Sequence, residues 1–144
     1  MQSAKHGRKE EIGYMIRTLS CHCGNVRLEV NAELKELGEC NCSTCARWGM
    51  IVWKVPSKAV RLATPSVAMG TYYWRFADEG YHWCLNCGTP MYRTWRDDII
   101  SLNARCIEGI DVFDLKTKRG DGMHRIPGGP VPPLPESFEA GSDA

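Results

Sequence analysis

The sequence predicts a mainly β, single-domain fold made of short antiparallel strands with little helix. A chain of 144 residues has the length of one domain. Short runs in which apolar and polar residues alternate are separated by turn residues such as Pro56-Ser57, Pro65-Ser66 and Asp97-Asp98. The strand-like runs do not alternate regularly with helical segments, so we do not expect a parallel α/β sheet.

The predicted elements follow one another closely along the chain. Val26, Leu28 and Val30 alternate with polar residues, which indicates a strand with one buried side. Residues 32–38 are typical of a loop, and the short helix after them is capped by Asn41 or Ser43 and ends at Gly49. Further strands are expected at residues 50–55, 59–62, 67–76, 89–95 and 99–103.

Composition divides the chain into three segments. Residues 1–16 form a polar N-terminal extension, and residues 17–120 form the β domain. Residues 121–144 form a Pro-rich tail that holds five of the eight prolines. Such a tail is too poor in apolar residues to form a packed core by itself.

Charge and hydropathy exclude several kinds of partner. The formal net charge is +1, so no overall basic field attracts a nucleic acid, and no nucleic-acid partner is expected. The apolar runs are too short for a signal peptide or a membrane span, which predicts a cytoplasmic protein with no membrane partner. Eight cysteines are many for a reducing compartment, and this number favours metal binding over disulfides. The sequence leaves the oligomeric state open.

Seven of the eight cysteines fall into clusters with metal-ligand spacing. Cys21 with Cys23, and Cys84 with Cys87, each supply half of a tetrahedral zinc site, so these four are predicted to bind one structural zinc. The middle cluster has three cysteines, Cys40, Cys42 and Cys45.

Three thiolates leave one coordination position open, which is typical of a catalytic zinc rather than a structural one. The predicted cofactor is therefore zinc, with two ions per chain. The middle cluster has two alternatives: a closed site completed by a histidine or Cys106, or reactive thiols that form a disulfide without metal. Cys106 lies in an apolar run and is expected to be a small buried side chain.

The cysteine motifs resemble those of the glutathione-dependent formaldehyde-activating enzyme family, which includes centromere-protein-V relatives. The resemblance spans residues 18–110 and rests on the motifs SCHCGNV from Ser20, CNCSTCAR from Cys40 and WCLNCGTPMY from Trp83. It implies a β-tent architecture with a structural zinc on the outer four cysteines and a second zinc on the middle three. It also implies a carbon–sulfur lyase that makes S-(hydroxymethyl)glutathione, with glutathione or another small thiol and an aldehyde as partners.

The residues around the middle cluster suggest how such a thiol is held. A thiol at the open position of the second zinc loses its proton and can add to an aldehyde, so Cys40, Cys42 and Cys45 are the predicted catalytic residues. Arg47 and Lys54 are candidates to bind carboxylates of the substrate. A pocket wall at Trp48 and a substrate-facing His82 complete the predicted binding residues.

Two other functions remain open from the sequence. The chain could be a non-catalytic module in which both zinc ions stabilise the fold and a surface binds a protein. A thiol-disulfide redox protein based on Cys84 and Cys87 is less favoured, because no thioredoxin-like βαβ pattern surrounds them.

Overall fold

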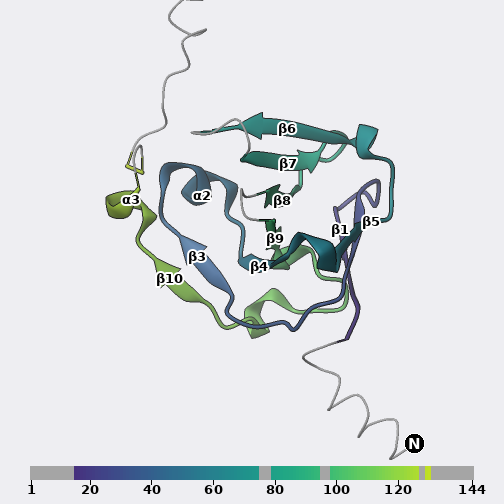
Figure 1. Cartoon of the computed structure of the whole chain (residues 1–144), viewed down its shortest axis with the longest axis horizontal. Helices are drawn as coiled ribbons and strands as arrows, with labels where there is room; N and C mark the ends of the chain where they lie inside the picture. The colour runs from purple at the N-terminus through teal and green to yellow at the C-terminus, as the bar shows by residue number, and fades with distance from the viewer. Residues whose placement is uncertain (1–14, 75–78, 95–97, 127–128, 131–144) are drawn as a thin grey trace, which may run out of the picture.

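The computed structural model describes residues 15–74, 79–94, 98–126 and 129–130. In these residues the chain forms ten strands in two sheets, with two short helices (Figure 1). The prediction of a mainly β, single-domain fold is therefore confirmed. Most of the predicted N-terminal extension and of the Pro-rich tail lies outside the described residues, so the segment boundaries at residues 17 and 120 stay predictions.

The smaller sheet has three antiparallel strands, in the order β1-β2-β5. Its strands are β1 (Arg17–Ser20), β2 (Arg27–Val30) and β5 (Val60–Leu62). The turn between β1 and β2 carries Cys21 and Cys23, so this hairpin delivers the first cysteine pair.

The larger sheet has seven strands in the order β10-β3-β4-β9-β8-β7-β6. Their bounds are β3 (Gly38–Cys40), β4 (Val52–Pro56), β6 (Met69–Tyr73), β7 (Gly80–Cys84), β8 (Pro90–Thr94), β9 (Ile99–Asn103) and β10 (Lys118–Gly120). Neighbouring strands are antiparallel except β10 and β3, which are parallel. This pair departs from the expectation of antiparallel strands throughout.

The two α-helices are short and both lie near the middle cysteine cluster. The first contains Cys45, and the second begins beside the Cys40 sulfur. They are α2 (Ser43–Trp48) and α3 (Gly122–Arg125). Single 3-10 turns connect other elements: η1 (Ser57–Ala59), η2 (Ser66–Ala68), η3 (Ala104–Cys106) and η4 (Val112–Asp114). Within the described part of the chain, no helix has both the length and the apolar character needed to cross a membrane.

One apolar core joins the two sheets. Leu19 and Leu28 of the smaller sheet belong to the same buried cluster as Trp53, Met91 and Leu102 of the larger one. The Trp53 indole N–H donates a hydrogen bond of 3.0 Å to the Glu33 carbonyl, so its one polar atom is satisfied in the core. Cys21 and Cys84 lie in this cluster too, which places one metal-ligating group at the junction of the sheets.

Several predicted strands occur, with shifted ends. The expected strand at residues 99–103 coincides with β9, and the one at residues 89–95 contains β8. The strand expected at residues 67–76 is shorter in the structure, because η2 precedes β6. Part of that predicted range, residues 75–76, lies outside the described residues.

The sequence prediction missed β1, β3, β7 and β10 and misplaced the cap of the first helix. Of these strands, β3, β7 and β10 each contain a glycine, which weakens the alternating pattern. The residue that caps α2 is Cys42, whose sulfur accepts the Cys45 backbone N–H at 3.4 Å, and neither Asn41 nor Ser43 has this role. The predicted helix end is confirmed, since Gly49 adopts the left-handed conformation with φ 68°.

Candidate metal centres

Two pairs of cysteines, about sixty residues apart in the sequence, form one compact group of sulfurs, here called the four-cysteine group. It consists of Cys21, Cys23, Cys84 and Cys87, whose sulfurs all lie within 4.8 Å of one another. The distance between the Cys21 and Cys23 sulfurs is 3.6 Å, and that between the Cys23 and Cys84 sulfurs is 3.7 Å. Four sulfurs on a tetrahedral zinc with 2.3 Å bonds are about 3.8 Å apart, so this group fits a zinc ion.

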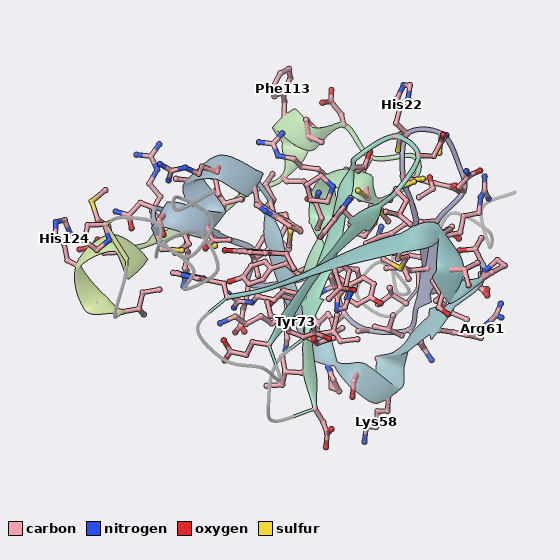
Figure 2. All side chains as sticks on the ribbon, turned by 90° about the horizontal axis from the view of Figure 1, so that it is seen from above. His22, Lys58, Arg61, Tyr73, Phe113 and His124 are labelled. Atoms are coloured by element: carbon pink, nitrogen blue, oxygen red, sulfur yellow. The ribbon has the colours of Figure 1, made fainter. Side chains whose placement is uncertain are left out.

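The local backbone explains how each pair of this group converges. Cys21 to Gly24 form a turn, closed by a 3.2 Å hydrogen bond from the Gly24 N–H to the Cys21 carbonyl, with Gly24 at φ 84°. The turn brings both sulfurs of this pair to one side. His22 points away from the sulfurs into solvent (Figure 2). In the second pair, Gly88 at φ 77° follows Cys87 and lets the chain turn around the group.

Hydrogen bonds to sulfur prepare part of this group for a metal. The Val26 N–H donates to the Cys21 sulfur at 3.2 Å, and the Thr89 hydroxyl lies 3.2 Å from the Cys87 sulfur. Burial acts to raise the pKa of Cys87, but hydrogen bonds from the hydroxyl and backbone of Thr89 outweigh it and lower this pKa to about 5. Burial raises the pKa of Cys84 to about 11. Since metal ligation requires the thiolate, a bound cation would favour the deprotonated form of Cys84, which burial disfavours.

Three cysteines form a second group, here called the three-cysteine group: Cys40, Cys42 and Cys45. Their sulfurs also lie within 4.8 Å of one another, at the end of β3 and the start of α2. The Cys42 N–H donates to the Cys40 sulfur at 3.4 Å, and the Cys45 N–H donates to the Cys42 sulfur at 3.4 Å. The start of the helix therefore turns the chain so that three neighbouring sulfurs meet.

The surroundings of this group shift the pKa values of Cys40 and Cys45 in opposite directions. Burial acts to raise the pKa of Cys40, but backbone N–H groups of Cys42 and Gly122 outweigh it and lower this pKa. Burial raises the pKa of Cys45, and the neighbouring sulfurs of Cys42 and Cys40 add to the effect. A cation among the three would relieve this repulsion, so the donor set suits a metal ion such as zinc.

A cleft of about 540 Å³ opens directly beside the three-cysteine group. Its walls include all three cysteines and five cationic residues, and the cations are Lys54, Arg93, Lys118, Arg119 and Arg125. Three carboxylates, of Glu36, Glu39 and Asp121, also line it. By contrast, the four-cysteine group does not line this cleft.

The predicted substrate residues are placed differently from one another. Lys54 lines the cleft, whereas Arg47 and Trp48 line a separate cleft with Tyr72 and Trp83. The Arg47 side chain donates a 2.8 Å hydrogen bond to the Ser43 carbonyl of its own helix. Trp48 also borders a small cavity that Cys45 shares, so it remains close to the three-cysteine group.

His82 lies on the other face of β7 from Tyr81, which packs with Cys42. Its imidazole lies 3.0 Å from the Thr71 hydroxyl and stacks on Tyr92, with 4.6 Å between the ring centroids. Burial lowers the pKa of His82. These contacts are those of a packed strand histidine, and His82 does not line the cleft beside the three-cysteine group.

Arg93 is one of the cleft residues that the sequence analysis missed. Its guanidinium donates a 3.0 Å hydrogen bond to the Tyr81 hydroxyl and lies 5.4 Å from the centroid of that ring. Arg93 shares the same face of β8 as the buried Met91. An arginine on the apolar face of a predicted strand is a signal that could have identified it.

Cys106 is a packed side chain and does not belong to either sulfur group. Its sulfur lies 3.6 Å from the Pro90 carbonyl and 3.8 Å from the Met91 sulfur. Burial, and to a smaller extent the sulfurs of Cys21 and Cys87, raise the pKa of Cys106 to about 12.

Comparisons with known proteins agree with the fold and the cysteine pattern. The glutathione-dependent formaldehyde-activating enzyme family matches this chain over residues 16–114. A crystal structure of a Rhodobacter sphaeroides protein is similar, with a TM-score of 0.65 and 24% sequence identity over 72% of this chain and 99% of that chain. The family match contains both cysteine groups, and the likeness to the crystal structure supports the fold.

Substitution of one cysteine tests whether the four-cysteine group binds a structural metal ion. We expect Cys84→Ala to lose one zinc ion and at least about 3 kcal/mol of stability, or roughly 10 °C in Tm, because metal binding energy is folding energy. Cys106→Ala, which removes another buried cysteine, should keep its zinc and lose only about 1 kcal/mol. Elemental analysis and thermal melts measure both; equal losses in the two variants would contradict the assignment.

Cys106 gives a test by pH. With a pKa of about 12, its thiolate fraction at pH 8 is on the order of one in ten thousand, and it grows only as the pH rises toward that value. Iodoacetamide at pH 8 should therefore leave Cys106 unmodified in the native, metal-loaded protein. Peptide mass spectrometry checks this, and alkylation of native Cys106 at the rate of a free cysteine would refute it.

Proposed function

The chain belongs to the glutathione-dependent formaldehyde-activating enzyme family, and we propose that it is a zinc-dependent carbon–sulfur lyase that joins a small thiol such as glutathione to an aldehyde, or releases the two from their adduct. The observation that carries this proposal is the three-cysteine group at the wall of a cationic cleft. A site closed by four protein ligands would instead serve only the fold.

The two sulfur groups would have different roles. Cys21, Cys23, Cys84 and Cys87 would hold a structural zinc, and Cys40, Cys42 and Cys45 would hold the second. When bound by three thiolates, zinc supplies a position at which an incoming thiol is held as its thiolate. Among the described residues, no fourth histidine, cysteine or carboxylate ligand accompanies the three, which supports an exchangeable position.

The reaction needs a positioned thiolate and an aldehyde, and it has a simple balance. The thiol gives up its proton, the sulfur electron pair forms the carbon–sulfur bond, and the carbonyl π pair moves onto oxygen, which takes up one proton. No group is oxidised or reduced. Because the reaction itself is undemanding, orientation of the two reactants is the main contribution that this chain can make.

The cleft residues would provide that orientation. Lys54 and Arg93 lie on neighbouring parts of the wall beside the three-cysteine group and would hold a carboxylate of the thiol. Arg93 is itself fixed by its hydrogen bond to Tyr81, so its guanidinium is held in place before the substrate arrives. Glutathione offers two carboxylates to such a site.

Binding of the thiol group can be tested separately from binding of the carboxylates. We expect glutathione to bind the two-zinc protein at least about tenfold more tightly than S-methylglutathione, which has the same carboxylates but offers no thiolate. Isothermal titration calorimetry measures both. Equal affinities would contradict thiolate binding, and no binding of either would favour the non-catalytic zinc module.

Arg93 gives a test of carboxylate recognition. Arg93→Gln should weaken glutathione binding by about tenfold, the loss expected for one charge-assisted hydrogen bond, and should leave the affinity for 2-mercaptoethanol unchanged. Arg61→Gln is the matched control, since Arg61 lies on β5 of the smaller sheet and does not line the cleft. Figure 2 shows Arg61 at the opposite side of the molecule from His124 of α3. Equal weakening for both thiols in the Arg93 variant would assign it a purely structural role.

A further inference from the structure

A segment close to the C-terminus lies along the three-cysteine group although it is about eighty residues away in sequence. We name it the C-terminal latch, residues 118–126. β10 pairs in parallel with β3 and places Gly120 opposite Cys40. Figure 1 shows β10 alongside β3, with α3 following it at the edge of the molecule. The latch lies beyond residues 16–114, the range that matches the family.

The closest approach of the latch to the group is at Gly122. Its backbone lies against the Cys40 sulfur, and the Gly122 N–H is one of the groups that lower the pKa of Cys40. A Cβ atom at this position would lie 2.5 Å from the Cys40 sulfur and 3.1 Å from the Cys42 Cβ. Residue 122 therefore has to be glycine for the backbone to lie this close to the sulfur.

The side chain of Asn41, between two of the cysteines, holds the latch from the other side. Its amide nitrogen donates to the Asp121 carboxylate at 3.0 Å, and its amide oxygen accepts the Met123 N–H at 2.8 Å. One side chain thus bonds the residues on both sides of Gly122. Further along, the Ser43 N–H donates to the Gly129 carbonyl at 2.7 Å, so α2 is bonded to this end of the chain as well.

We propose that the C-terminal latch is part of the three-cysteine metal centre, with Gly122 and Asn41 as positioning residues that fix Cys40 and slow the loss of its metal. The inference rests on the proposed function in one respect, that this group binds a metal. Residues that contact a metal ligand from outside the ligand set orient it and raise the metal affinity of the site. A latch packed against Cys40 also covers one side of the group, which limits the approach of a competing chelator.

The test measures metal release from each group separately. The two-zinc protein is mixed with 4-(2-pyridylazo)resorcinol, and the faster and slower phases of zinc release are assigned with Cys42→Ser and Cys87→Ser. We expect Gly122→Ala and Asn41→Ala each to speed release from the three-cysteine group by about 10-fold to 100-fold, with no change at the four-cysteine group. In the cobalt-substituted protein, the same variants should alter the thiolate charge-transfer bands of the three-cysteine group only.

Gly120→Ala is the matched control, because the same added methyl group lies an ordinary 3.7 Å from the Glu39 carbonyl. It should release both metals at the wild-type rates. Unchanged release from the three-cysteine group in both Gly122→Ala and Asn41→Ala would overturn the inference, and so would equal acceleration at both groups, which indicates general destabilisation. A wild-type protein that binds only one metal ion would instead contradict the proposed function on which the inference rests.

Discussion

The convergence of four sulfurs from two sheets is the interaction on which the rest of this structure depends. Cys21 and Cys23 come from the β1–β2 turn of the smaller sheet, and Cys84 and Cys87 come from the end of β7 in the larger one. Their sulfurs are spaced as a tetrahedral zinc requires. A metal ion there would join the two sheets beside the core they share.

The three-cysteine group has a different physical character, because its ligands are local. Cys40, Cys42 and Cys45 lie within six residues, at one strand end and the helix start that follows it. Such a group closes no long loop, so metal binding there adds little to the stability of the fold. In the proposed function, this difference would let one site serve the fold while the other keeps a ligand position for chemistry. It also explains why contacts from outside the local segment would matter to the second site.

The sequence predicted the cysteine groups well because their spacing is a local property. It could not predict Arg119 or Gly122 as residues of the cleft beside the three-cysteine group, since the pairing of β10 with β3 brings this distant segment there. The parallel pairing of β10 with β3 was hidden for the same reason: it depends on the return of a distant segment. The sequence also could not show the surroundings of His82, because strand alternation places its side chain on the face of β7 opposite to Tyr81, where it contacts Thr71 and Tyr92.

The charged residues of the cleft show why the net charge of the whole chain is a poor guide to the ligand. The chain has a formal net charge of +1, which argues against a general affinity for polyanions. Around the three-cysteine group, however, the sheet order gathers five cations and three carboxylates within one cleft. Cations in this arrangement suit a small anion with few charges, and the interspersed carboxylates disfavour a long polyanion or provide partners for an amino group. In the proposed function, a thiol that carries both carboxylates and an amino group, as glutathione does, would match this mixed pattern better than a simple acid. The positions of the cations relative to the sulfurs would then decide which end of the thiol faces the metal.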